Sequence, residues 1–287
     1  MKRVWAGIIM FILVAAGIGA SHVVRPPERF TAMTFNVRHP HSSDSHSWSQ
    51  RRVGIKTLLN DQKPDIIGFQ EVTAPMEHDL AAMLGKQYAH YGKMRSADSD
   101  SEMTPIFVNT TKFRVLDKGT FFLSETPDTT YSRGWDAKYP RVATWMALGE
   151  PGLTNASLVV INTHLDHKGG KAQAESGKLI ARRAKALGGR FDAPTLIMGD
   201  FNSSPVDPSI TSIWQSGDFT DSYHALDVAE QDNALTSHGD SYKTLGKPID
   251  YISAEKPLTI SNAAILREKY SDVWPSDHYP VIVTVTQ

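Results

Sequence analysis

The sequence predicts an α/β fold in which two similar sheets face each other and helices cover their outer sides. A strand, a helix and a second strand follow one another over residues 30–71, and the same order returns over residues 158–202. Each sheet must bury both of its faces, so two such units indicate two packed sheets with helices outside. In both units the strands end in polar residues, which are expected to converge.

Strands are expected where short apolar runs are bounded by polar or turn residues. Residues 30–36 alternate apolar and polar side chains, which is typical of a strand. Residues 66–69 form a continuous apolar run that leads into Gln70 and Glu71. The same criteria predict the remaining strands, over residues 113–123, 142–148, 158–161, 195–198, 249–252 and 281–285.

Three helices are expected to connect or cover these strands. Residues 48–59 place three apolar side chains on one helical face, those of Ile55, Leu58 and Leu59. Pro75 opens a second helix that extends to Leu84, because proline is tolerated in the first helical turn. Residues 172–187 form the clearest helix, with alanine and leucine at helical spacing and basic residues toward the end, where they suit the helix dipole.

Composition bounds the class of protein. With 287 residues, of which 40% are hydrophobic and 21% charged, the chain can bury a substantial core in one large domain or two small ones. The net charge of −1 does not favour a nucleic-acid-binding protein, because such proteins usually carry a basic surplus that neutralises phosphate. The absence of cysteine from the sequence excludes thiol catalysis, cysteine-ligated zinc and disulfides.

The N-terminal segment predicts export. Lys2 and Arg3 precede an apolar run that ends near Ala20, so residues 1–21 are interpreted as a secretory signal peptide or a single membrane anchor. Positive charges remain inside, which places the rest of the chain outside the cytoplasm and leaves the N-terminal segment able to contact the membrane. Residues 22–28 are interpreted as a linker, and residues 29–287 as one catalytic domain, expected to be a monomer.

Six positions at strand ends carry polar groups that could do chemistry. A single such residue is explained equally well as a cap, an Asx turn or a helix-dipole partner, so the argument depends on their recurrence. Carboxylates, amides and histidines together provide what hydrolysis needs, namely a metal ligand, a water activator, an orienting group and a proton carrier. The positions are Asn36, Glu71, His164, Asp200 with Asn202, Asp250, and Asp277 with His278.

Six short motifs, in this order along the chain, resemble those of the endonuclease/exonuclease/phosphatase superfamily. They cover nearly the whole of residues 29–287, and one alone would be weak evidence. The resemblance implies a DNase I-like fold, a four-layer α/β sandwich of two facing, mixed, mainly antiparallel sheets with helices outside. The motifs are residues 34–38 (TFNVR), 69–72 (FQEV), 162–165 (NTHL), 199–202 (GDFN), 249–251 (IDY) and 276–278 (SDH).

The resemblance also implies a metal site. Glu71 would be the main ligand of a Mg²⁺ or Mn²⁺ ion, a hard cation that prefers carboxylate oxygen. Asn36 would lie beside it, and Asp277 would be a second metal contact; whether one ion or two are bound stays open. Three histidines on a nearby polar loop have irregular spacing, which favours solvated side chains over a metal site: His39, His41 and His46.

The remaining residues would carry the catalytic roles that the resemblance implies. Asp200 would orient and deprotonate the attacking water, while Asn202 and His164 would contact phosphate oxygens. His278 would stabilise the charge that develops on the phosphoryl group, and Asp250 would hold its imidazole in orientation. The implied reaction is metal-assisted, in-line attack of water on a phosphoester.

Further segments are similar to bacterial members of the superfamily that act as small phosphatases: residues 123–127 (LSETP), 134–136 (GWD) and 140–145 (PRVATW). In the last of these, Arg141 would bind the substrate's phosphate as a bidentate fork. A surface arginine on a strand is the alternative. Loops 92–100 and 236–240 differ from that subgroup, so the identity of the substrate stays open.

These observations favour an exported, Mg²⁺-dependent phosphoesterase that acts on a phosphorylated small molecule or a lipid-derived phosphate. A secreted DNA or RNA nuclease is the alternative among enzymes, and it would need more cations around the site than the sparse candidates Arg95, Lys168, Lys171 and Lys243. A non-catalytic binding module on the same fold is the alternative from another class. It is disfavoured because none of the six ionisable or polar positions is lost.

Overall fold

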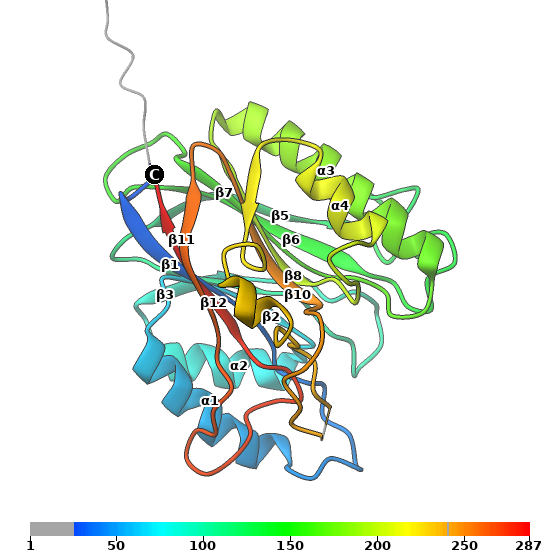
Figure 1. Cartoon of the computed structure of the whole chain (residues 1–287). Coiled ribbons are helices and arrows are strands. Elements are labelled where there is room, and N and C mark those ends of the chain that lie inside the picture. Colours follow the sequence, from blue (N-terminus) through cyan, green and yellow to red (C-terminus); the bar gives the residue numbers. More distant parts are fainter. Residues whose placement is uncertain (1–25, 240) are drawn as a thin grey trace, which may run out of the picture.

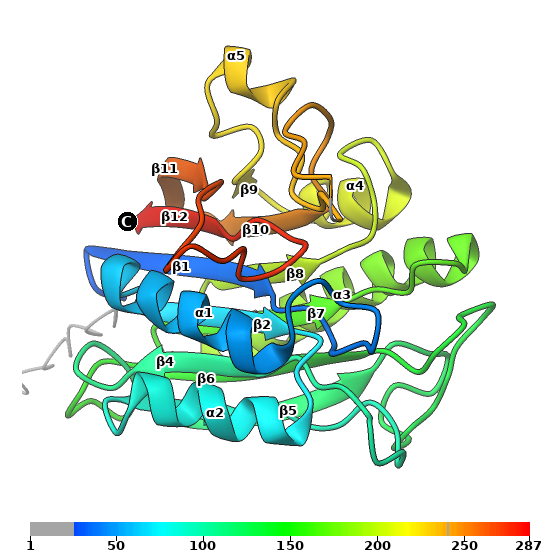
Figure 2. The same cartoon turned by 90° about the horizontal axis from the view of Figure 1, so that it is seen from below.

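The fold is a sandwich of two sheets with helices on both outer sides, as Figure 1 and Figure 2 show for the computed structural model. The structure describes residues 26–239 and 241–287. The predicted signal peptide or anchor, residues 1–21, lies outside the described residues, as does most of the predicted linker. Within those two ranges, no helix combines the length and the apolar character that crossing a membrane requires.

The first sheet has the strand order β11-β12-β1-β2-β4-β3. Its central strands β1 and β2 are parallel, with Asn36 opposite Gln70, whereas the pairs that flank them are antiparallel. Parallel neighbours end at the same edge of a sheet, so Asn36 and Glu71 emerge side by side. The strands are β1 (Arg29–Asn36), β2 (Ile66–Gln70), β3 (Tyr88–Tyr91), β4 (Ile106–Asn109), β11 (Thr259–Ile265) and β12 (Val281–Thr286).

The second sheet repeats this plan in the order β5-β6-β7-β8-β10-β9. Its parallel pair is β7 and β8, with His164 opposite Asp200, and the antiparallel strand β10 brings Asp250 opposite Asp200 on the other side. Three polar residues thus meet at one edge. The strands are β5 (Arg114–Phe122), β6 (Val142–Gly149), β7 (Leu158–His164), β8 (Thr195–Asp200), β9 (Phe219–Asp221) and β10 (Asp250–Glu255).

Three hydrophobic clusters separate the four layers. One lies between the two sheets, and the other two lie between each sheet and its helices. Helices α1 (Trp48–Gln62) and α2 (Ala74–Leu84) cover the first sheet, and α3 (Gly170–Phe191) and α4 (Pro208–Trp214) cover the second, while α5 (Val228–Gln231) is a single turn in a loop (Figure 2). The predicted four-layer α/β sandwich is therefore confirmed.

A buried polar bridge joins the two sheets close to their functional edge. Gly68 allows the close approach, because a Cβ atom there would lie 2.6 Å from the sulfur of Met198 and 2.7 Å from the side chain of Asn162. In the adjoining space Gln70 Nε2 donates to Asn162 Oδ1 at 2.7 Å, and Asn162 Nδ2 donates to the carbonyl of Phe69 at 2.8 Å. These bonds fix the relative position of the two strands, although Gln70 Oε1 is buried without a hydrogen-bond partner among the described residues.

Candidate active site

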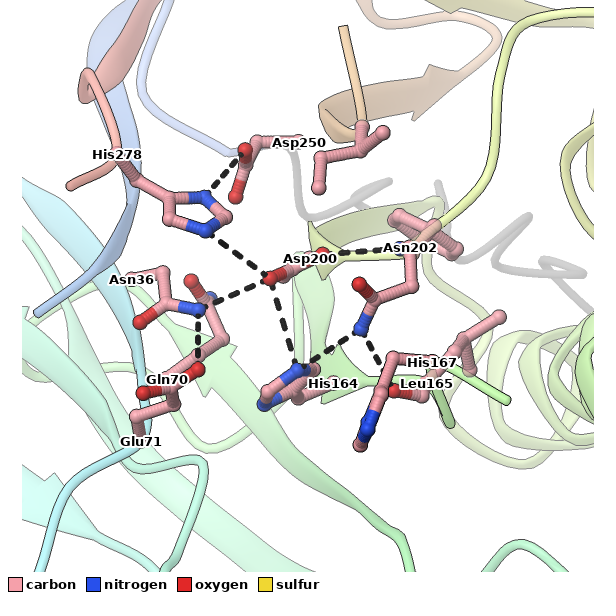
Figure 3. A network of polar contacts seen from close by, with 12 residues as sticks. Asn36, Gln70, Glu71, His164, Leu165, His167, Asp200, Asn202, Asp250 and His278 are labelled. Atoms are coloured by element: carbon pink, nitrogen blue, oxygen red, sulfur yellow. Dashed lines mark hydrogen bonds and ion pairs between the residues drawn. The ribbon is translucent and has the colours of Figure 1, made fainter. Parts of the chain in front are cut away.

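The polar strand ends of both sheets meet at one end of the sandwich (Figure 3). Asn36 links the halves directly: its Nδ2 donates to Glu71 Oε1 at 3.0 Å within the first sheet and to Asp200 Oδ2 at 2.9 Å in the second. His164, Asn202, Asp250 and His278 surround Asp200, so the structure brings seven of the nine predicted site residues into one network. The other two, Arg141 and Asp277, are described below.

Glu71 is held as an anion at the end of β2. Its φ of 61° lies in the left-handed region, which is unusual for a residue with a side chain and often marks a functional position. The backbone N–H of His39 donates to Oε2 at 2.6 Å. Burial alone would raise the pKa of Glu71, but the hydrogen bonds from His39 and Asn36 outweigh burial and lower that pKa. The carboxylate is therefore ionised at neutral pH.

The residue before Asp200 must be glycine, because any side chain at position 199 would be strained. Gly199 has a φ of 153°, and a Cβ atom there would lie 2.2 Å from the carbonyl oxygen of Thr163 on the neighbouring strand. Asp200 itself is buried, and its Oδ1 accepts the backbone N–H of Asn202 at 2.9 Å. Burial and the charge of Asp250 raise the pKa of Asp200 to about 7, so this carboxyl group can exchange a proton near neutrality.

Asp250 and His278 form a buried acid–imidazole pair. His278 Nδ1 lies 2.9 Å from Asp250 Oδ2, and the other ring nitrogen, Nε2, lies 3.9 Å from Asp200 Oδ2. Burial alone would lower the pKa of His278, but the charge and the hydrogen bond of Asp250 raise it to about 10. The loop is fixed by Ser276, whose hydroxyl donates to the carbonyl of Asn36 at 2.7 Å. The result is a positioned imidazolium that faces Asp200.

His164 is a neutral acceptor whose tautomer follows from its neighbours. Asn202, at a φ of 48°, directs its Nδ2 to the carbonyl of Leu165 and to His164 Nε2, both at 3.0 Å. The carbonyl can only accept, which fixes the amide orientation and makes Nε2 an acceptor, so the ring proton is on Nδ1. Nδ1 is buried without a hydrogen-bond partner among the described residues. Burial, followed by the charge of Arg141, lowers the pKa of His164 well below its usual value.

Arg141 is a buried guanidinium with unmet donors. The residue is 4% exposed, its Nη2 donates to His167 Nδ1 at 3.2 Å, and its Nε lies 3.8 Å from Asp166 Oδ2. In the part of the chain that the structure describes, Nε and Nη1 have no hydrogen-bond partner. Burial and neighbouring Arg95 lower its pKa, because both oppose the charged form. A buried cation with free donors favours an anionic ligand.

The site opens into a polar cavity of about 550 Å³. One end is formed by Arg141 and by those residues of the network in Figure 3 that reach the cavity, namely Glu71, His164, His167, Asp200, Asn202 and His278. The opposite side, called the outer wall here, comes from loops 95–102 and 138–140. Asp166 and His167, which hold Arg141, and Glu102 on the outer wall were not among the predicted site residues. The remaining lining residues are His39, His41, Arg95, Ser96, Asp98, Asp100, Ser101, Lys138, Tyr139 and Pro140.

Asp277 and the loop histidines occupy different surroundings. Asp277 Oδ2 lies 3.1 Å from Arg38 Nη1, in a small recess that also contains His46, apart from the network around Glu71. His39 and His41 line the main cavity instead, with ring centroids 5.2 Å apart. The ring of His39 contacts the carbonyl of Asp100 at 3.1 Å. These contacts link the loop after β1 to the outer wall.

Two groups of side chains suit a cation. Among the described residues, Asp200, Asp250 and His278 place one ligand atom each within 4.8 Å of one another, and this buried group could hold a metal ion. Its imidazole, however, already shares Nδ1 with Asp250. Glu71, an ionised carboxylate on the cavity wall, offers the hard oxygen that Mg²⁺ and Mn²⁺ prefer. Asn36 supports this carboxylate through its Nδ2, while its own Oδ1 accepts the backbone N–H of Arg38 at 3.0 Å. The residues present therefore fit a divalent cation.

Carboxylates, an imidazolium and an arginine with unmet hydrogen-bond donors gather where the two sheets of the sandwich meet. This combination of fold and site defines the class of hydrolytic phosphoesterases. Residues 33–278 match the model of the Endonuclease/Exonuclease/phosphatase family, and the chain belongs to this family. A search of the curated proteins gives no match.

Solved structures agree with this assignment. An endonuclease/exonuclease/phosphatase family protein from Bacteroides thetaiotaomicron is 30% identical, with a TM-score of 0.80 over 90% of this chain and 97% of that chain. A mannosyl-6-phosphatase from the same organism is also 30% identical, with a TM-score of 0.81 over 90% and 100% of the two chains. The catalytic domain of human nocturnin, at 17% identity, a TM-score of 0.71 and coverage of 92% and 96%, shares the fold.

Proposed function

We propose that this protein is a Mg²⁺-dependent phosphomonoesterase that acts on a small phosphorylated molecule. The observation that carries the proposal is Arg141, a buried guanidinium whose Nε and Nη1 have no hydrogen-bond partner among the described residues, on the wall of the cavity that contains Glu71 and His278. The similar mannosyl-6-phosphatase, matched along its whole length, supports a monoester substrate. The apolar N-terminal run supports the further proposal that the enzyme acts outside the cytoplasm.

The chain's own residues provide binding, orientation and proton transfer. Arg141 binds two oxygens of the terminal phosphate as a fork. The Nε2–H of His278 donates a hydrogen bond to a phosphoryl oxygen, and Asp250, whose Oδ2 lies 2.9 Å from Nδ1, holds the ring in the orientation that this requires. A divalent cation held by Glu71, whose Oε1 accepts from Asn36, would supply charge that offsets the negative phosphate.

Asp200 is placed to accept the proton of the attacking water. Its pKa of about 7 lets it take that proton near neutral pH, and Asn36 and Asn202 fix both of its oxygens. Water attacks phosphorus in line with the departing alcohol oxygen, and the P–O bond to the alcohol breaks. The leaving oxygen takes up a proton from solvent water, Asp200 returns its proton to solvent, and inorganic phosphate and the alcohol are released. Asn202 Nδ2 donates to His164 Nε2, and this contact fixes the imidazole next to Asp200.

The test is a comparison of a monoester, a diester and DNA. We expect phenyl phosphate to be hydrolysed with Mg²⁺, to be spared in EDTA and to be hydrolysed again when Mg²⁺ is restored, with bis(p-nitrophenyl) phosphate and plasmid DNA much slower. Arg141→Ala should raise the KM for phenyl phosphate at least about tenfold, because a charge-assisted fork is lost. Arg114→Ala, a change in an exposed arginine on β5, is the matched control. Fast plasmid degradation beside an untouched monoester would overturn the proposal and favour the nuclease.

A further inference from the structure

We propose that the outer wall of the cavity selects a hydroxyl-rich leaving group that carries no second phosphate, and that Glu102 is the residue that imposes this selection. The inference rests on the proposed phosphomonoesterase function and adds the class of substrate to it. It starts from the cavity volume of about 550 Å³, which leaves room for a leaving group beyond the phosphate-binding end.

Glu102 and Arg95 are locked together on this wall. Arg95 Nη1 lies 2.7 Å from Glu102 Oε2, and Arg95 Nη2 donates to Glu102 Oε1 at 3.1 Å, which is a bidentate pair. The backbone N–H of Arg95 also donates to the carbonyl of Glu102 at 2.9 Å. The Arg95 guanidinium lies 4.9 Å from the ring centroid of Tyr139. With their side chains 14% and 13% exposed, both partners are ordered by these contacts and present a fixed surface.

The position of Glu102 determines the charge next to the phosphate site. Arg95, Glu102 and Arg141 line one small recess, together with Met103, Thr104, Val142 and His164. The charges of Arg95 and Glu102 both act on Arg141, so two arginines share this region with one carboxylate. Without Glu102, the pair of arginines would be an attractive site for a second phosphate. With Glu102 in place, the charge of Arg95 is neutralised, and the two carboxylates of Asp98 and Asp100 outweigh the single positive charge of Lys138 on the same wall. A substrate with a second phosphate near this wall is therefore disfavoured.

The chemistry of the wall also decides against an apolar leaving group. Among the described residues that line the cavity, no leucine, isoleucine, valine, phenylalanine or methionine occurs, and charged and polar groups stand between the apolar parts contributed by residues such as Tyr139 and Pro140. An acyl chain would therefore cover polar groups and leave them without hydrogen bonds. Fixed carboxylate acceptors stand beside serine hydroxyls and guanidinium donors, including Ser96 and Ser101. Such an array satisfies several hydroxyl groups at once, and a site built this way discriminates against analogues that lack them.

Three substrates test the preference for hydroxyl groups and the exclusion of a second phosphate separately: phenyl phosphate, a hexose 6-phosphate and a hexose 1,6-bisphosphate. We expect the parent protein to show a kcat/KM for the hexose 6-phosphate at least about tenfold above that for phenyl phosphate and above that for the bisphosphate. Glu102→Ala should lower kcat/KM for the hexose 6-phosphate at least about tenfold more than for phenyl phosphate, and it should raise the ratio of bisphosphate to monophosphate turnover.

Two further variants keep the test decisive. Glu77 lies outside the cavity lining, and its Oε1 is 2.6 Å from Nε2 of His90. Glu77→Ala is therefore the control, and it should leave the ratios of kcat/KM among the three substrates unchanged. Glu102→Gln keeps the shape and one acceptor, so it serves in place of Glu102→Ala if circular dichroism shows that the alanine variant is unfolded.

Hydrolysis of phenyl phosphate at least as fast as that of the hexose 6-phosphate, or equal effects of the Glu102 variants on all three substrates, would overturn the inference and leave the proposed function standing. Hydrolysis of none of the three by the parent protein with Mg²⁺ would overturn both.

Discussion

Asp250→Asn tests whether His278 acts as a buried imidazolium. The replacement keeps the shape of the side chain and removes the charge that lies 2.9 Å from Nδ1. Burial, which lowers the pKa of His278, is then opposed only by the charges of Asp200 and Asp277, so we expect this pKa to fall from about 10 toward its usual value. With a pKa of about 6.5, only about a tenth of the imidazole is charged near pH 7.5, whereas nearly all of it is charged in the parent protein.

The smaller fraction of charged His278 alone should lower kcat about tenfold. The imidazole also loses the orientation that Asp250 gives it, so we expect kcat to fall by about 10²- to 10³-fold in total. The assay combines an NMR titration of the His278 ring with kcat for phenyl phosphate near pH 7.5. Asp221→Asn is the matched control, because Asp221 holds His224 in a similar pair at 2.7 Å on another part of the surface. A His278 pKa that stays near 10 in Asp250→Asn, or a kcat within about threefold of the parent, would refute the reasoning.

The remaining predictions concern the cation and the backbone. Glu71→Gln keeps the shape but removes the anionic ligand, so most activity should be lost and the Mg²⁺ concentration for half-maximal rate should rise. Glu77→Gln is the control and should leave both quantities unchanged. The same result for Glu71→Gln would contradict the assignment of Glu71 as the metal ligand. Gly199→Ala should lower the free energy of unfolding in urea by about 2–4 kcal/mol, because its Cβ would lie 2.2 Å from the carbonyl of Thr163. Gly170→Ala, with open space around its Cβ, should change it by less than about 1 kcal/mol, and equal effects at the two glycines would argue against strain.

Local sequence patterns were sufficient for the central parts of the fold. The strands of both parallel pairs and helices α1, α2 and α3 carry continuous apolar runs or helical spacing, because they are buried on at least one face. Strands β3, β4, β9 and β11 were not predicted. They are short or lie toward a sheet edge, and β11 is largely exposed, so pairing with β12 rather than burial defines it. Such pairing depends on contacts between distant segments, which leave no local pattern.

The same distinction applies to the site. Strand-end residues such as Glu71 and Asp200 could be found because the ends of parallel strands share an edge. Glu102 lies in an irregular loop, and only its pairing with Arg95 in three dimensions gives it a place in the cavity. The polar run that continues beyond His164 could have pointed to Asp166 and His167, but their contact with Arg141 is made across separate segments.

Asp277 shows a limit of reasoning from adjacency. It directly precedes His278 in the sequence, yet the two side chains contact different partners, Arg38 for the aspartate and Asp250 for the histidine. Asp277 lies at a bend in the chain, and His278, directly after it, forms an isolated bridge with Ser237. Two residues that are adjacent in the sequence can therefore lie in different sites, and only the folded structure shows which site each side chain enters.

The amide bridge between Gln70 and Asn162 has a consequence for how the molecule could be divided. The first sheet and its connections contribute Asn36, Glu71 and His278, whereas the second contributes Asp200 and Asp250, so the reacting groups are shared between two structurally similar halves. Either half, if it folded alone, would present an incomplete set of groups. Because β12 follows β10 in the chain but joins the first sheet, no single cut separates the halves either. Any ancestor built from one such unit would have needed a second copy before it could assemble this constellation.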